Sequence, residues 1–356
     1  MKICIYAIAK DEIKNTERFI KNLKEADEVV VADTGSTDGT VEKLRSLGAR
    51  VESISVNPWR FDEALNKALA LVPADATVAM RMDLDEVPDP GWRKEIEKAY
   101  TPSVKMMKAN YIWSHLPNGD TDLAFMSTRI HIPNQFKWVL PTHECLHYIG
   151  PPGEYQEKNT GVVIHHWPDA LKPRPNDLPL LEMGVKEDPN SQRASFYLAR
   201  EYYFRQKYSE AKVEFQRYLI LSRWNSERSK AMRMLASIAM IENNRPEQLR
   251  WLSLATVEAP KEREAWVELA QFYHDDKDYL GGYHAAKQAL SITQRTDFFT
   301  EAFAWGSLPY DLAGTCAYYI GLHDEFVSLT TQALQLDPTN ERLRSNLKLF
   351  AHKVST

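Results

Sequence analysis

The chain of 356 residues is 44% hydrophobic and 26% charged, with a formal net charge of −5. This composition is typical of a soluble globular protein and excludes a disordered, collagen-like or membrane-spanning one, while the length predicts two domains. The mean hydropathy is −0.46, and the apolar runs are too short for a transmembrane segment or a legible secretory signal.

Short apolar runs alternate with helix-like segments in the first half of the chain. The pattern predicts strands at 3–9, 29–33, 50–56 and 76–82, separated by helices at 12–25, 40–47 and 61–71. Strands separated by helices predict an α/β fold with a mostly parallel sheet flanked by helices. After residue 103 the strand-like pieces 104–112, 124–132 and 161–166 are divided by Pro, Asn and Gly. We therefore expect mixed or antiparallel strands to complete the sheet.

The second half of the chain reads as helical and repetitive. Residues 168–192 contain five prolines, which predicts a first domain at 1–170, a linker at 171–192 and an all-α domain at 193–356. In that last domain Ala199, Ala236 and Ala270 are 37 and 34 residues apart, close to the 34-residue period of tetratricopeptide-type helix pairs. Small residues at such positions let paired helices approach closely. A generic helical bundle is the alternative.

The charge is distributed unevenly along the chain. Residues 1–170 carry 20 basic and 25 acidic side chains, whereas 171–356 carry 24 of each. Within the second half, 193–250 holds 12 basic against 6 acidic residues. Such a stretch is either a binding surface for a polyanion, including nucleic acid, or a set of solvated helix faces.

Carboxylates follow two of the predicted strands, and ligands of an open α/β sheet bind beyond the carboxyl ends of its strands. Asp33 closes the strand 29–33, where it can accept hydrogen bonds from a uracil imide or a ribose hydroxyl, or simply shape the turn with Asp38. Asp83 and Asp85 follow the strand 76–82 two residues apart, so an extended backbone projects both to one side. Oxygen ligands of this kind suit Mg²⁺ or Mn²⁺, which also bind substrate phosphates.

The phrase DTGSTDGT (33–40) after a hydrophobic strand, with DLDE (83–86) after a later one, resembles the family 2 glycosyltransferases of A-type fold. The resemblance implies that Asp33 contacts the base of a nucleotide-sugar. It also implies that Asp83 and Asp85 bind a divalent metal, Mn²⁺ or Mg²⁺, and the donor diphosphate. One subgroup of that family often carries tetratricopeptide-like helices behind its catalytic domain.

Finer matches to this subgroup imply further site residues. IAKDEI (8–13) resembles its K-N-E phrase, with Asp11 in place of Asn, and implies nucleotide contacts from Lys10 and Glu12. Arg60 with Asn66 reproduces an R-x5-N spacing in which the arginine faces the nucleotide.

VVIHHW (162–167) resembles a phrase of the same subgroup, I-H-x-G, whose histidine can complete the metal site. Pro168 stands where Gly is usual, so both His165 and His166 are candidates. Strand alternation lets only one of them face the site, and we favour His166.

Transfer of a sugar with inversion requires a base on the face opposite the departing diphosphate. PTHECLH (141–147) resembles the V-H-E phrase of the subgroup, and we expect Glu144 to be this base. Asp122, in the loop NGDTDLAF, is the second candidate. An ordinary structural carboxylate is the alternative for Glu144.

The sequence therefore predicts a metal-dependent, inverting glycosyltransferase. Its donor is expected to be a UDP-linked nucleotide-sugar, and its acceptor a protein, a glycan or another macromolecule, including nucleic acid, held by the helical repeats. A catalytically weak scaffold whose repeats bind a protein or nucleic acid is the alternative. A nucleotidyltransferase is a third possibility, but IAKDEI lacks the glycine-rich basic loop that such enzymes place after the first strand.

The cysteines point to a cellular compartment. The three cysteines, Cys4, Cys145 and Cys316, lie far apart in the sequence. An odd number of widely spaced cysteines indicates free thiols in a reducing environment, so we expect a cytoplasmic protein.

Overall fold

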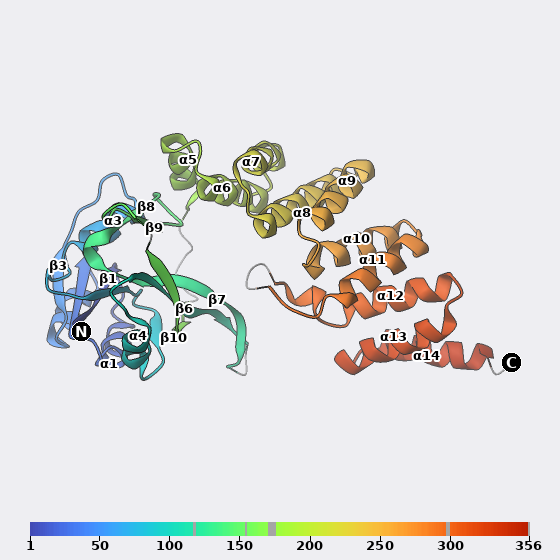
Figure 1. Ribbon diagram of the computed structural model, residues 1–356, viewed down its shortest axis with the longest axis horizontal. Coiled ribbons are helices and arrows are strands. Elements are labelled where there is room, and N and C mark those ends of the chain that lie inside the picture. Colours follow the sequence, from blue (N-terminus) through green and yellow to red (C-terminus); the bar gives the residue numbers. More distant parts are fainter. Residues whose placement is uncertain (117–118, 154, 170–175, 297–299, 355–356) are drawn as a thin grey trace. The chain divides into compact units, whose positions relative to one another are not determined.

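The computed structural model describes residues 1–116, 119–153, 155–169, 176–296 and 300–354. The chain divides after Pro189 into two units, Met1–Pro189 and Asn190–Thr356, which Figure 1 colours from blue to green and from green to red. Part of the predicted linker is helical, because α5 spans Leu178–Glu187. Residues 171–175 of that linker lie outside the described residues.

An eight-stranded mixed sheet is the centre of the first unit, with the strand order β3-β2-β1-β4-β7-β6-β10-β5. Strand β1 (Ile3–Ala9) pairs in parallel with β2 (Glu28–Asp33) and β4 (Val78–Arg81), and β2 with β3 (Arg50–Ser53). The remaining strands are β5 (Glu86–Pro88), β6 (Val104–His115), β7 (Thr121–His131) and β10 (Gln156–His166). Strand β7 is antiparallel to β4 and β6, and β10 runs parallel to β6 but antiparallel to β5. The predicted mostly parallel sheet, completed by mixed strands, is confirmed.

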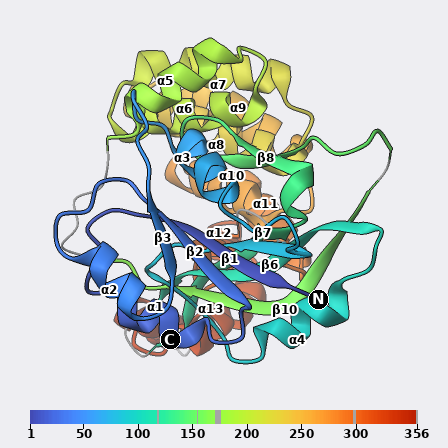
Figure 2. The same ribbon diagram turned by 90° about the vertical axis from the view of Figure 1, so that its left-hand side faces the viewer.

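Helices and a small hairpin cover the two faces of this sheet. Successive residues of β1 point to opposite faces, and both sets are buried: Ile3 and Ile5 join one core, while Cys4 and Tyr6 join another. The first core packs on α1 (Thr16–Asn22), α2 (Thr40–Ser46) and α4 (Trp92–Ala99), and the second on α3 (Phe61–Leu69) and the hairpin of β8 (Phe136–Val139) and β9 (Cys145–Tyr148). Figure 2 shows α3 and β8 on one side of the sheet and α1, α2 and α4 on the other.

Several elements differ from the prediction. The expected helix 12–25 is shorter, because α1 begins only at Thr16. The residues before it form a loop in which Asp11 adopts a left-handed conformation with φ 53°. The sequence pattern also missed β5, α4, β8 and β9, which are short elements of three, eight, four and four residues. Periodicity has little to act on in segments of that length.

The described residues of the second unit form four helix pairs and a final helix. The pairs are α6 (Gln192–Phe204) with α7 (Tyr208–Leu221), α8 (Asn225–Ile241) with α9 (Arg245–Glu258), α10 (Arg263–Asp275) with α11 (Tyr279–Ser291), and α12 (Leu308–Tyr319) with α13 (His323–Leu336), followed by α14 (Glu341–Val354). Among the described residues, no helix has the combination of length and apolarity needed to cross a membrane.

All four pairs share one turn. Three residues join the helices of each pair, and the middle residue has a positive φ in every case: Gln206, Asn243, Lys277 and Gly321. The next N–H donates to a carbonyl five residues earlier, as in Lys207 to Tyr202 and Leu322 to Ala317. Seven residues before these turn centres lie Ala199, Ala236, Ala270 and Gly314, and the three alanines are buried. This common geometry confirms the predicted tetratricopeptide-like repeats.

The basic stretch 193–250 is largely neutralised inside the helical unit. Eight of its twelve basic residues form ion pairs with carboxylates: Arg205, Lys212, Arg217, Arg228, Lys230, Arg233, Arg245 and Arg250. Four of these reach partners beyond residue 250, such as Arg228 with Glu258 and Lys230 with Glu301. Much of the local excess of positive charge is therefore paired with carboxylates of later segments of the unit.

One carboxylate among the described residues of the first unit is completely buried. Glu86 at the start of β5 has 0% of its surface exposed. Its Oε1 accepts from Arg129 Nη2 of β7 at 2.9 Å and from the Tyr111 hydroxyl of β6 at 2.7 Å, and its Oε2 accepts from the backbone N–H of Asp83 at 2.8 Å. Burial raises the pKa of Glu86, although the charge of Arg129 opposes this.

Replacing Arg129 should reveal how strongly the burial of Glu86 opposes folding when its cation is missing. Arg129→Met leaves Glu86 buried without its cation, so we expect the free energy of unfolding to fall by about 3–5 kcal/mol. The pKa of Glu86 then rises further in the folded state. In the pH interval between the unfolded and the folded pKa, Glu86 is protonated in the folded chain but ionised in the unfolded chain. Stability falls as the pH rises through that interval, and the deficit should be smaller at about pH 5 than at about pH 8 in denaturant unfolding. Arg129→Met/Glu86→Gln should recover much of the loss; an equal deficit at both pH values without recovery would contradict this.

A second test concerns the contact between helix pairs. Gly→Ala inside a helix normally stabilises by about 0.5–1 kcal/mol. At Gly282 of α11, however, an added Cβ would lie 2.7 Å from Cys316 Sγ of α12. We expect Gly282→Ala to destabilise the wild-type chain but to stabilise the Cys316→Ala variant, as measured by chemical denaturation. The same sign in both backgrounds would rule out this steric explanation.

Candidate functional site

The turn after β2 is organised by Asp33. This residue is buried, and its Oδ2 accepts from the backbone N–H groups of Gly35 at 3.0 Å and Ser36 at 3.1 Å. The structure therefore gives Asp33 a turn-shaping role. A carboxylate offers about four lone-pair sites, so the capacity to accept a further hydrogen bond remains.

The loop after β1 is fastened to this turn. Asp11 Oδ1 accepts from the Thr37 N–H at 2.7 Å, and the Asp11 N–H donates to Ser36 Oγ at 2.9 Å. The Glu12 N–H donates to Thr40 Oγ1 at 2.8 Å. These contacts hold the segment with Lys10 and Glu12 against the segment that begins at Asp33. The candidate nucleotide residues of β1 and β2 thus lie on two adjoining loops at one edge of the sheet.

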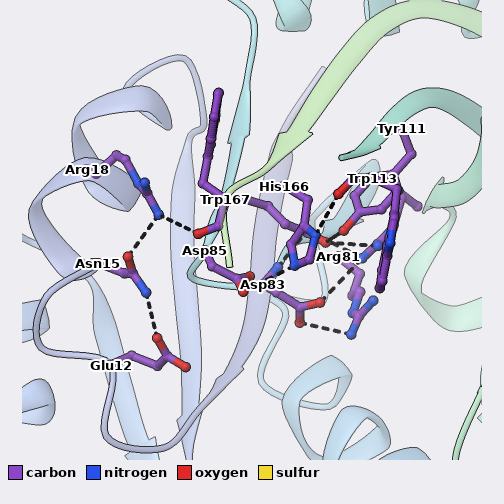
Figure 3. A network of polar contacts seen from close by, with 12 residues as sticks. Glu12, Asn15, Arg18, Arg81, Asp83, Asp85, Tyr111, Trp113, His166 and Trp167 are labelled. Carbon is purple, nitrogen blue, oxygen red and sulfur yellow. Dashed lines mark hydrogen bonds and ion pairs between the residues drawn. The ribbon is translucent and has the colours of Figure 1, made fainter. Parts of the chain in front are cut away.

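Asp83 and Asp85 lie on the turn after β4 and have different partners. Asp83 Oδ1 lies 2.9 Å from Arg81 Nη2, and its Oδ2 lies 3.8 Å from Arg129 Nη1. Asp85 Oδ2 lies 3.4 Å from His166 Nε2 at the end of β10 (Figure 3). Asp83 therefore faces two arginines, which it shares with Glu144 and Glu86, whereas Asp85 faces an imidazole.

The two neighbouring histidines point to different sites. His166 Nδ1 lies 3.1 Å from the carbonyl oxygen of Trp113, which favours the tautomer with a proton on Nδ1 and a lone pair on Nε2. His165 instead lies 2.9 Å from His115 Nε2 and 3.2 Å from Asp89 Oδ1. The structure thus places His166, and not His165, against Asp85.

The donor set of Asp85 and His166 fits a divalent cation. Ligand atoms that share a cation at about 2.1 Å lie roughly 3 Å apart, close to the 3.4 Å between Asp85 Oδ2 and His166 Nε2. The carbonyl behind Nδ1 is the outer contact that orients metal-binding imidazoles. Within the described ranges no group of three or more His, Cys, Asp or Glu side chains is arranged to hold a metal. Mg²⁺-type sites commonly use one or two protein ligands, with phosphate oxygens and water completing the shell.

The contact between Asp85 and His166 shifts their pKa values in opposite directions. Burial opposes the carboxylate of Asp85, but the hydrogen bond and charge of His166 outweigh it, so the pKa of Asp85 is lowered. Burial likewise opposes the imidazolium, but Asp85 raises the pKa of His166.

Glu144 shares a guanidinium with Asp83. Arg81 Nη2 lies 3.4 Å from Glu144 Oε1 and 2.9 Å from Asp83 Oδ1, and the Arg81 side chain is only 11% exposed. The loop of Glu144 is thereby brought to the carboxyl end of β4. Asp122 lies elsewhere, on an exposed part of β7, where it accepts from Ser114 Oγ at 2.7 Å. Of the two base candidates, Glu144 is the one joined to Asp83, through Arg81.

Arg60 and Asn66 have partners within the fold. The guanidinium of Arg60 pairs with Asp62 at 2.7 Å and with Glu187 of α5 at 2.8 Å. The side-chain amide of Asn66 exchanges hydrogen bonds with the backbone N–H and carbonyl of Trp138. Arg60 lines a shallow groove of about 400 Å³ along α3, which no residue of the β4 turn lines.

Sequence reasoning missed two arginines beside the aspartates. Arg81 follows three buried apolar residues in β4, and a charged residue at the end of an apolar strand was the signal that could have identified it. Arg18 carried no such signal, because a basic residue on a short amphipathic helix is commonplace. Its side chain lies near Asp85 in Figure 3.

Comparisons with known proteins match separate parts of the chain. The model of the family Glycosyl transferase family 2 matches residues 4–103. An "Uncharacterized glycosyltransferase" of Rickettsia bellii (strain RML369-C) is 48% identical over 59 residues, which are 16% of this chain and 19% of that relative. The match therefore spans about a fifth of the relative's length.

Solved structures match about half of the chain. MamA is 17% identical with a TM-score of 0.38, over 46% of this chain and 89% of its own. PilF of Pseudomonas aeruginosa is 12% identical with a TM-score of 0.39, over 47% of this chain and 70% of its own. From the family match and the described helix pairs, the chain carries an N-terminal domain of the glycosyl transferase family 2, followed by an all-helical unit of tetratricopeptide-like pairs.

Proposed function

We propose that the protein is an inverting, metal-dependent glycosyltransferase that moves a sugar from a UDP-linked donor to a protein or glycan. One observation carries the proposal. The carboxyl end of β4 brings together the Asp85–His166 pair and Glu144, which is joined to Asp83 through Arg81. These groups come from three separate stretches of a chain whose N-terminal domain matches glycosyl transferase family 2.

The donor side of the reaction rests on the strand ends. Asp33 and the loop of Lys10 and Glu12 supply the nucleoside contacts, while Asp85 and His166 would hold Mn²⁺ or Mg²⁺ against the diphosphate. The cation, when bound, stabilises the negative charge that accumulates on the leaving diphosphate. Asp83 remains on Arg81 and Arg129, so that its carboxylate presents a fixed acceptor to the donor's hydroxyl groups.

The acceptor side rests on Glu144. Its carboxylate removes the proton of the acceptor hydroxyl or amide as the new bond to the anomeric carbon forms. Arg81 Nη2, 3.4 Å from Glu144 Oε1, fixes the orientation of this carboxylate. Asp122, an exposed carboxylate of β7 beside Ser114, remains the second candidate.

The helical unit favours a protein or glycan over a polyanion as its partner. Eight of the twelve basic residues in 193–250 are already ion-paired, so little unpaired positive charge is left for a nucleic acid. The catalytically weak scaffold remains the competing function, and turnover is what separates the two.

The metal-binding pair gives the first test. Asp85→Asn should lower the Mn²⁺-dependent release of UDP from UDP-sugars by about 100-fold or more, since it removes a charged ligand from the cation. The matched control is Asp89→Asn, which alters a carboxylate that faces His165 instead, and it should remain active. If the wild-type chain neither turned over UDP-sugars nor bound nucleotides, the proposed glycosyltransferase activity would be wrong.

The base gives the second test. Glu144→Gln should reduce kcat by about 10²- to 10⁴-fold. Its affinity for UDP, measured by calorimetry, should stay close to that of the wild type. Asp122→Asn serves as the comparison, and a loss of kcat in that variant alone would transfer the role to Asp122.

A further inference from the structure

The arginines around the candidate site differ in how their charge is balanced. Arg81 pairs with Asp83 and Glu144, and Arg129 pairs with Glu86. Arg60 likewise pairs with Asp62 and Glu187. Arg18 on α1 is the exception, since among the described residues it forms no ion pair with a carboxylate.

Arg18 is also incompletely hydrogen-bonded. Its Nη2 donates to Asn15 Oδ1 at 2.8 Å and weakly to the carbonyl oxygen of Trp167 at 3.4 Å. Its Nε is buried with no hydrogen-bond partner, one of four such side-chain atoms in the described part of the chain. A second of the four is Arg81 Nε, on the other side of the aspartates. Buried donors are almost always satisfied, so an unpaired one beside a site points to a missing acceptor.

The surroundings place this acceptor next to Asp85. The Trp167 carbonyl accepts from Arg18, and the Trp167 N–H donates to the Asp85 carbonyl at 2.9 Å. In Figure 3, the Arg18 side chain extends from α1 toward Asp85. A diphosphate held through a cation on Asp85 and His166 would therefore lie on the side to which the Arg18 guanidinium points.

A short chain of contacts sets the direction of Arg18. Glu12 Oε2 accepts from Asn15 Nδ2 at 2.7 Å, which turns Asn15 Oδ1 toward Arg18 Nη2. Glu12 thus acts on Arg18 through Asn15, in addition to the nucleotide contact expected of it. The loop after β1 and the metal-binding pair are connected through this arginine.

We propose that Arg18 binds the diphosphate of the donor, with its guanidinium turning from Trp167 to donate two hydrogen bonds to phosphate oxygens. A planar guanidinium matches two phosphate oxygens, and its positive charge attracts the negatively charged diphosphate. Arg18 is then a binding residue for the leaving group. The proposal rests on the proposed function, because it needs a diphosphate donor at the β4 turn.

The test compares a diphosphate with its nucleoside. We would titrate the full chain with UDP by calorimetry in the presence of Mn²⁺, and follow uridine by ligand-observed NMR. Arg18→Met should weaken UDP binding by about 10- to 100-fold and leave uridine binding unchanged. Lys21→Met removes a positive charge from the exposed side of the same helix and should change neither. Arg18→Lys should recover part of the loss.

Several outcomes would overturn the assignment. If Arg18→Met binds UDP as tightly as the wild type, Arg18 does not contact the diphosphate, while the proposed function stands. If Arg18→Met and Arg18→Lys weaken UDP and uridine equally, Arg18 supports the fold of the site only. If the wild type binds none of UDP, GDP, ADP and CDP, the proposed function fails, and the role of Arg18 fails with it.

Discussion

The carboxylate of Glu86, which has no contact with solvent, holds together the strands that carry the candidate site. It receives hydrogen bonds from Arg129 of β7, from Tyr111 of β6 and from the backbone of Asp83. The turn with Asp83 and Asp85 is therefore anchored from inside the protein before any ligand is present. Because Arg129 pairs with Glu86, the other arginine beside Asp83, Arg81, can join Asp83 to Glu144. One interior ion pair thus sets the positions of the side chains at the surface.

Where a physical pattern is local, the sequence was sufficient. The continuous apolar run of β1 predicted a strand buried on both faces, and the structure divides its side chains between two cores. The regular spacing of Ala199, Ala236 and Ala270 predicted close helix pairs, and all three side chains are buried. Asp33, Asp83 and Asp85 could be selected because they follow predicted strands, and ligand sites form at such ends. Their roles in catalysis stay predictions.

Where a contact joins distant parts of the chain, the sequence was insufficient. No spacing rule brings Glu144 to Arg81, 63 positions earlier, because the loop that carries it is placed by the packing of β8 and β9. The resemblance to the R-x5-N phrase implied a nucleotide contact from Arg60, but it did not reveal that Glu187 lies beside Arg60. The basic excess at 193–250 looked like a binding surface, since the carboxylates that neutralise it come partly from later helices, as Glu258 and Glu301 do.

The common turn of the four helix pairs has a consequence for cooperativity. Each helix pair closes through its own three-residue turn. Most ion pairs of this unit stay within one helix pair or join two neighbouring helix pairs. The stability of such an array is approximately a sum of terms for single pairs and for neighbouring interfaces. The helical unit should therefore unfold as a linear series that frays from its last pairs, while the sheet of the first unit, whose strands are distant in sequence, unfolds as one body.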